Sequence, residues 1–144
     1  MNGGHRLIQS GVLLFLLGLL TGLAPAALAL PRLGVSAHIL ATAGGTFLIA
    51  LGMVWPRLTL GPGTSLSAAR LAIYANYAGW LAPLLGGIWG AGGSMLPIAA
   101  GDVRGSAFEE AIIAALLVTA ALALIAACVV VLWGLRAGPP REGT

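Results

Sequence analysis

Charged side chains are scarce in this 144-residue chain. They make up 8% of it, whereas a soluble domain carries about 25%. Hydrophobic residues make up 59%, and the mean hydropathy is +1.01. These values exclude a soluble enzyme and indicate a membrane protein. Lysine is absent, and the seven basic residues are arginines scattered along the chain, so nucleic-acid binding has no support.

Several catalytic and ligand-binding motifs are also missing. The sequence contains no phosphate-binding Gly-Lys-Ser/Thr loop, no Gly-x-Ser-x-Gly elbow and no paired carboxylates within an apolar run. These absences exclude ATPases and serine hydrolases, and we expect no nucleotide cofactor. The single cysteine, Cys128, lies in an apolar run and cannot form an internal disulfide.

Four apolar runs are long enough to cross a lipid bilayer, which takes about 20 helical residues. Unpaired backbone groups are costly in lipid, and the alternation of barrel strands is absent, so the runs are expected to be helices. We predict an all-α polytopic membrane protein, a four-transmembrane-helix bundle with one domain at residues 1–137 and a polar tail at 138–144. The runs cover residues 7–30, 36–55, 71–92 and 111–135, separated by a tight turn at 31–34, a connection at 56–67 and a loop at 92–106.

The arginines divide unevenly between the two sides of this predicted bundle. Five fall on the side of the termini and two on the other, and cytoplasmic loops are enriched in basic residues. The sequence therefore predicts that both termini are cytoplasmic. The five are Arg6, Arg57, Arg70, Arg136 and Arg141, and the two are Arg32 and Arg104.

His38 is the ionisable residue that falls inside a predicted span. Thr42, Gly45 and Thr46 share its helix face, which we expect to look into protein. Two interpretations are open: an interfacial histidine hydrogen-bonded to a loop carbonyl, or an axial ligand of a metal or haem iron. One neutral imidazole is enough to hold haem iron, whereas a structural zinc site needs three or four ligands that the spans do not contain.

The third run carries the richest polar and aromatic set of the chain. Asn76 needs a hydrogen-bond partner in lipid, so it should point inward or toward a neighbouring subunit. Tyr77 and Trp80 combine apolar rings with hydrogen-bonding tips. Tyr74 and Trp80 suit either an aromatic belt at the membrane interface or an aromatic-lined pocket.

Two adjacent carboxylates precede the fourth run. Glu109 and Glu110 stand at its predicted N-terminus, where the helix dipole favours anions. The alternative is that one of them acts as an acid or base near the mouth of a cavity.

Five segments, taken in order, carry a family resemblance. They read GVLLFLLGLLTG (residues 11–22), PRLGVSAH (31–38), LGMVWPRL (51–58), YAGW (77–80) and WGAGGSMLPI (89–98). Together they resemble the hydroxylaminobenzene mutases, small bacterial membrane enzymes of nitroaromatic degradation. These enzymes convert hydroxylaminobenzene to 2-aminophenol by moving the hydroxyl from nitrogen to the ortho carbon.

A fainter resemblance reaches the styrene oxide isomerases, four-helix membrane isomerases that hold haem b through a histidine at the head of the second helix. Ala37-His38 matches that position. The resemblances imply a small aromatic substrate, haem b on His38, and a homo-oligomer in the bacterial inner (cytoplasmic) membrane, by analogy a trimer.

Hydroxyl transfer, the reaction that the resemblance implies, needs an electrophile for the departing oxygen and stabilisation of a ring cation, and these needs indicate roles for the candidate residues. A haem iron held by His38 would act as a Lewis acid on the N–O bond. Trp80 and Tyr77 would stack on the substrate ring and stabilise its positive charge, while Asn76 would orient the amino group.

The chain departs from the family pattern at three positions. The pattern has an Asn before the glycine matched by Gly45, an acidic residue two positions after the histidine, and an Asn in a Tyr-Ala-Asn-Trp motif. This chain has Gly44, Leu40 and Gly79 there. A divergent paralogue acting on another small aromatic is therefore an alternative. From the residues alone, a non-catalytic membrane scaffold or subunit is another.

Overall fold

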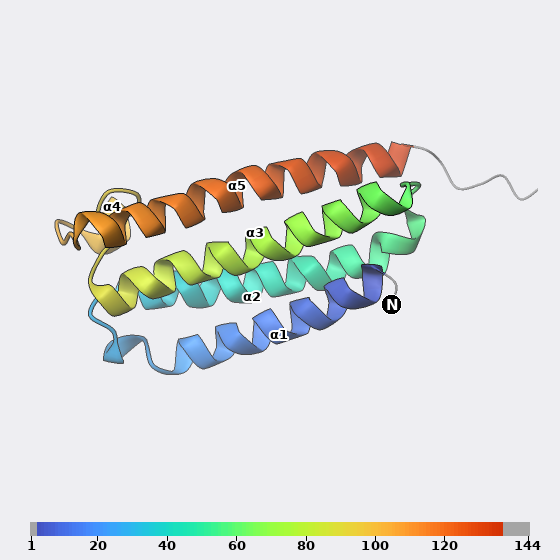
Figure 1. Cartoon of the computed structure of the whole chain (residues 1–144). Coiled ribbons are helices and arrows are strands. Elements are labelled where there is room, and N and C mark those ends of the chain that lie inside the picture. The colour runs from blue at the N-terminus through green and yellow to red at the C-terminus, as the bar shows by residue number, and fades with distance from the viewer. Residues whose placement is uncertain (1–2, 137–144) are drawn as a thin grey trace, which may run out of the picture.

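The computed structural model describes residues 3–136 of the chain. Four long α-helices run antiparallel to their neighbours (Figure 1). Within residues 3–136 there is no β-strand. The long helices are α1 (Gly3–Leu23), α2 (Pro31–Val54), α3 (Pro62–Trp89) and α5 (Ala107–Arg136); the short ones are η1 (Pro25–Ala27), η2 (Trp55–Arg57) and α4 (Pro97–Ala100).

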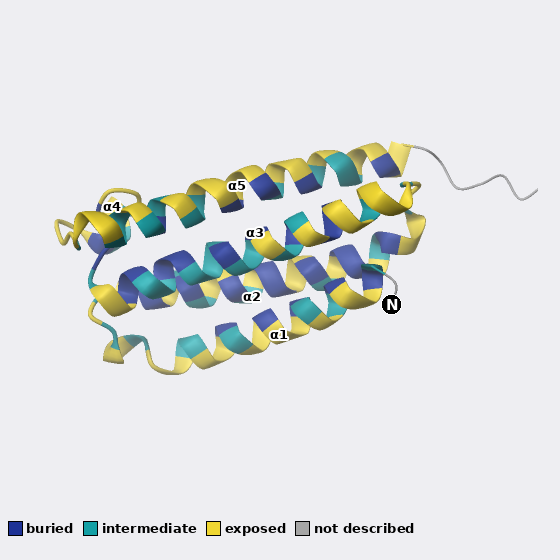
Figure 2. Cartoon of the chain, in the orientation of Figure 1, coloured by how far each residue is buried: buried dark blue, intermediate teal, exposed yellow. Residues whose placement is uncertain are grey.

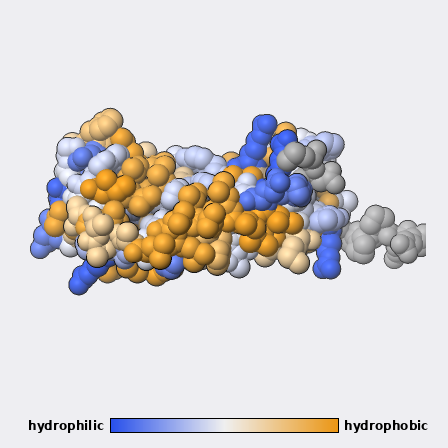
Figure 3. All heavy atoms as spheres, turned by 90° about the horizontal axis from the view of Figure 1, so that it is seen from below, coloured by the Kyte–Doolittle hydropathy of each residue, from blue (hydrophilic) through white to orange (hydrophobic). Residues whose placement is uncertain are grey.

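All four long helices are long and apolar enough to cross a membrane, which confirms the predicted all-α, multi-pass bundle. Hydrophobic residues cover the middle of the face shown in Figure 3, and strongly hydrophilic residues gather toward its two ends. The start of α1 and the end of α5 lie at the same end of the bundle (Figure 1). The polar tail predicted for residues 138–144 lies outside the described residues.

Three of the α-helices begin at a proline, and this corrects one predicted boundary. Residues 31–34, expected as a tight turn, are the first turn of α2. Proline suits the first position of a helix because its fixed φ is already helical and the missing N–H has no partner there. Pro62 and Pro97 begin α3 and α4 in the same way, so the expected connection at 56–67 and loop at 92–106 both contain helix.

The helices pack in an open arrangement. α1 packs against α2, α2 against α3, and α3 against α5. Among the described residues, α5 packs along its length against α3 alone. Its outward surface is largely exposed in Figure 2, as expected for a helix that faces lipid. One side of α3 therefore lies at the bottom of a gap between α2 and α5.

The buried interior is built largely from small residues. Alanines from α2, α3 and α5 are among the buried side chains, and the large fully buried side chains include Leu7, Leu14, Leu48 and Ile113. Because lipid is as apolar as leucine, close packing of small residues is the main way for membrane helices to associate. The small residues of the interior thus allow the helices to pack closely, as is typical of membrane proteins.

Candidate active site

The seam between α1 and α2 is a ladder of glycines with a seven-residue spacing. A Cβ added at Gly4 would lie 2.8 Å from the carbonyl oxygen of Gly52, and one at Gly11 would lie 2.6 Å from that of Gly45. Seven residues on from Gly11 comes Gly18, and seven before Gly45 comes His38. His38 therefore stands in the third step of a close backbone contact. The seven-residue spacing of these glycines is visible in the sequence, but it was not among the predicted features.

The His38 ring is held by the backbone of α1. Its Nδ1 lies 2.8 Å from the carbonyl oxygen of Gly18, and since a carbonyl cannot donate, Nδ1 carries the proton. In the neutral ring, Nε2 then carries the lone pair. A Cβ at Gly22 would lie 2.5 Å from Nδ1, so the ring needs a glycine at that position.

The environment of His38 fits a residue that would hold haem iron. Metal-binding histidines usually donate their second ring N–H to a carbonyl or carboxylate, as Nδ1 does to Gly18. Among residues 3–136, Nε2 has no hydrogen-bond partner, and it is not a buried atom. No group of three or more His, Cys, Asp or Glu residues in the described part could hold a metal ion, so a structural zinc site does not fit.

The face of α2 around His38 only partly follows the expectation that it looks into protein. Gly45 is buried against α1, whereas Thr46 is exposed. The hydroxyl groups of Thr42 and Thr46 donate to carbonyls one turn earlier, at 3.0 Å and 2.9 Å, so they are satisfied within their own helix. His38 itself is half-buried, at the edge of the seam.

Tyr77 and Trp80 lie on a different seam, between α3 and α1. The Tyr77 hydroxyl donates to the Ser10 carbonyl at 3.0 Å, and Trp80 Nε1 donates to the Thr21 hydroxyl at 3.2 Å. The two rings meet edge to face, with centroids 6.5 Å apart and planes at 88°. The polar groups of both side chains therefore form hydrogen bonds that connect α3 to α1.

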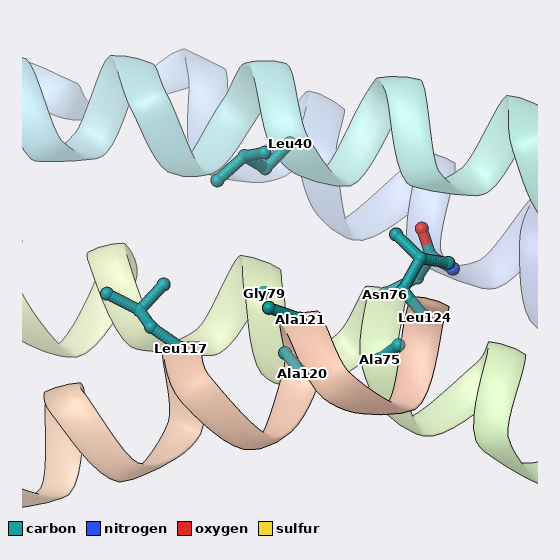
Figure 4. A pocket seen from close by; sticks show the side chains of 8 residues that line it. All are labelled: Leu40, Ala75, Asn76, Gly79, Leu117, Ala120, Ala121 and Leu124. Atoms are coloured by element: carbon teal, nitrogen blue, oxygen red, sulfur yellow. The ribbon is translucent and has the colours of Figure 1, made fainter. Parts of the chain in front are cut away.

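Asn76 lies in an open groove between α2 and α5, with α3 as its floor (Figure 4). The groove has a volume of about 210 Å³, and Asn76 supplies its one polar side chain. The amide nitrogen donates to the Ala72 carbonyl at 2.8 Å, while a Cβ at Gly44 would lie 2.6 Å from the amide oxygen. The other lining residues are Leu40, Ala75, Gly79, Leu117, Ala120, Ala121 and Leu124.

The three departures from the family pattern gather around this amide. Leu40 and Gly79 line the groove, and Gly44 faces the amide oxygen. A Cβ at Gly79 would meet nothing within 4 Å, so the groove is open beside that position. Positions far apart in the sequence therefore shape one site.

Within one chain, the four site residues predicted from the sequence lie in three separate places, two seams and the groove. His38 lies on the α1–α2 seam, Tyr77 and Trp80 lie on the α1–α3 seam, and Asn76 lies in the groove. Tyr74, the fifth aromatic or polar candidate, is 44% exposed, and its hydroxyl meets that of Thr119 on α5 at 2.6 Å.

The two carboxylates before the fourth span have structural partners. Glu109 accepts hydrogen bonds from the backbone N–H and hydroxyl of Ser106, and the Ser106 hydroxyl accepts one from the Glu109 N–H, which together form a capping box. Glu110 accepts from the backbone N–H groups of Gly92, Gly93, Ser94 and Gly105. Both carboxylates organise the start of α5 and the loop beside it.

The chain is similar to known membrane enzymes over most of its length. The chain matches the styrene oxide isomerase family over residues 4–136, which include all four spans. It is also 50% identical to hydroxylaminobenzene mutase HabB of Ectopseudomonas oleovorans over 97% of this chain and 85% of the relative. It is 40% identical to hydroxylaminobenzene mutase HabA of the same organism, over 90% of this chain and 96% of the relative.

The chain belongs to the styrene oxide isomerase family. It is therefore a membrane enzyme of the isomerase class, as the resemblance implied. No solved structure matches it. The family match contains His38, the aromatic pair and Asn76, so every candidate residue lies within the matched part of the chain.

Proposed function

We propose that this isomerase is a hydroxylaminobenzene mutase, which converts hydroxylaminobenzene to 2-aminophenol by moving the hydroxyl from nitrogen to the ortho carbon. The observation that carries the proposal is the 50% identity to a hydroxylaminobenzene mutase over 97% of this chain. The groove supports it, because a small neutral aromatic can enter from lipid through an apolar opening.

In this proposal the groove holds the substrate. The leucines and alanines that line it pack against the ring and exclude water, which would otherwise capture a ring cation. Asn76 is the polar group that orients the hydroxylamino substituent. Its amide nitrogen uses one hydrogen on Ala72, which leaves the second hydrogen and an oxygen lone pair for substrate.

We propose haem b as the cofactor, with His38 as the ligand. When bound, its iron supplies a Lewis acid that polarises the N–O bond. His38 would bind the iron through Nε2, since Nδ1 is occupied by the Gly18 carbonyl. Gly22 leaves space for the ring, so α1 fixes the direction of the free nitrogen.

Tyr77 and Trp80 belong to the proposal as catalytic residues whose ring faces stabilise positive charge on the substrate. They lie outside the groove of their own chain, so, as for His38, this role requires that the groove of a second copy comes beside the α1–α3 seam. Cation–π attraction contributes up to ~2 kcal/mol when the partners are desolvated. Their hydrogen bonds to α1 fix both rings, so little conformational freedom remains to be lost on binding.

We propose a homo-oligomer, by analogy a trimer, in the bacterial inner membrane with both termini in the cytoplasm. The separation of His38 from the groove supports an assembly, because a second copy can bring the groove of one chain near the histidine of another. The arginine distribution supports the orientation. A single monomer mass in mild detergent would contradict the oligomer.

An alternative substrate is a different small aromatic. Leu40, Gly44 and Gly79 change the surroundings of Asn76 relative to the family pattern, and the open space at Gly79 accommodates a ring substituent. A series of ring-substituted hydroxylamines, compared by kcat/KM, separates the two possibilities.

The experiment that tests the proposed function uses membranes containing the full chain, with haem supplied during expression. These membranes should form 2-aminophenol from hydroxylaminobenzene without nicotinamide, oxygen or ATP. Absence of product from folded, haem-loaded protein would overturn the proposal.

A further inference from the structure

A cleft with two arginines lies at the end of the bundle that carries residue 3. It is formed between the first turns of α1 and the beginning of α3, and its volume is about 260 Å³. Arg6 lines it from α1 and Arg70 lines it from α3. Both arginines are exposed, and neither forms an ion pair or hydrogen bond within residues 3–136.

Within residues 3–136, no acidic side chain lies at this end of the bundle. The acidic residues of the described part are Asp102, Glu109 and Glu110, and all three belong to the loop and helix start at the opposite end. Two guanidinium groups that flank one cleft are suited to bind the oxygen atoms of a phosphate group.

Most of the remaining lining of the cleft is apolar. Leu66 and Ile73 of α3 line it, and Ile73 lies in the apolar run at residues 71–92 that the sequence predicts to cross the bilayer. Ser65 adds a hydroxyl that accepts a hydrogen bond from Trp55 Nε1 at 3.1 Å and keeps its own proton to donate. A ligand with a phosphate head and a hydrocarbon chain matches both parts.

We propose that this cleft binds an anionic phospholipid, with the phosphate between Arg6 and Arg70 and an acyl chain along Ile73. The site is separate from both the His38 seam and the Asn76 groove. Each basic residue near a membrane surface adds attraction for anionic lipid, so the site discriminates phosphatidylglycerol from zwitterionic phosphatidylcholine.

The test is lipid titration of the purified full chain in neutral detergent, with bound lipids counted by native mass spectrometry. Wild-type protein should bind phosphatidylglycerol about tenfold more tightly than phosphatidylcholine. The R6Q/R70Q variant should lose this preference, whereas R32Q/R104Q, which removes two charges at the opposite end, should keep it. Equal affinity for the two lipids, or an equal loss in both variants, would overturn the proposal.

Two further arms make the result decisive. Inorganic phosphate and glycerol phosphate, titrated alone, should not displace phosphatidylglycerol; displacement at similar concentrations would identify a site for free phosphate and contradict the lipid. If R6Q/R70Q does not fold, R6K/R70K keeps the charges, and added salt should weaken the binding of phosphatidylglycerol more than that of phosphatidylcholine. Equal salt dependence would contradict the site.

Discussion

Small residues line both the α1–α2 seam and the α2–α5 groove, but with opposite results. In the seam, glycines bring two backbones into direct contact and leave His38 one fixed orientation. In the groove, alanines and Gly79 leave space, because α5 packs only against α3 there. Close contact holds the His38 ring in place, whereas the open space beside Asn76 is what the proposed substrate site requires.

The largest effect is expected from a substitution that separates α1 from α2. Gly11→Leu places a side chain where even a Cβ would lie 2.6 Å from the Gly45 carbonyl oxygen, so α1 must move away from α2. We expect a loss of stability of about 3 kcal/mol or more. Gly79→Leu is the matched control: a Cβ there meets nothing within 4 Å, so it should leave the thermal midpoint in detergent nearly unchanged. Equal losses in the two variants would show that the two regions do not differ as described.

Removal of the ligand tests the function of the seam. His38→Ala should abolish the Soret band of the purified protein, because the proposed haem loses its protein ligand. His5→Ala removes the other histidine, which is exposed, and should leave the band intact. A full band in His38→Ala, or a loss of the band in His5→Ala, would contradict the assignment.

A smaller effect is expected from the groove. Asn76→Leu removes the one polar side chain that lines it, and an unmade hydrogen bond costs about 1–3 kcal/mol. We therefore expect kcat/KM for hydroxylaminobenzene to fall about ten- to a hundredfold while the Soret band stays unchanged. Leu124→Ile, on the α5 wall of the same groove, should leave kcat/KM nearly unchanged. Loss of haem in Asn76→Leu would show that groove and seam are not separate.

The smallest effect comes from restoring the amides of the family pattern. Gly79→Asn has space and should change kcat/KM by about tenfold or less. Gly44→Asn alone should lower activity, because its Cβ collides with the Asn76 amide. The double variant Gly44→Asn/Asn76→Gly should recover part of the loss, and a double-mutant cycle in kcat/KM measures the coupling. Additive effects would contradict the contact between positions 44 and 76.

The sequence predicts the spans well because hydropathy decides which segments enter lipid. It also predicts that Asn76 points inward or toward a neighbouring subunit, since an amide in lipid needs a partner. In the structure the half-buried amide lines the open groove and donates to the Ala72 carbonyl of its own helix. The turn expected at 31–34 is wrong because proline can either end a segment or begin a helix, and composition does not distinguish the two.

The relation between the site residues does not follow from sequence periodicity. Helical spacing tells which residues share a face but not which neighbouring helix that face meets. Asn76, Tyr77 and Trp80 are close in sequence, yet their side chains meet different helices. The seven-residue spacing of Gly4, Gly11 and Gly18, matched on α2 by positions 38, 45 and 52, is a signal that can identify the His38 seam from sequence.

The measurement that tests the central claim most directly is the fate of the substrate oxygen. Hydroxylaminobenzene carrying ¹⁸O on nitrogen is converted in ordinary water by membranes containing the full chain, and the 2-aminophenol is examined by mass spectrometry. If the groove excludes water and the oxygen moves within one substrate molecule, the label will appear in the ring hydroxyl. Product without the label would show that the oxygen comes from water and would contradict the account.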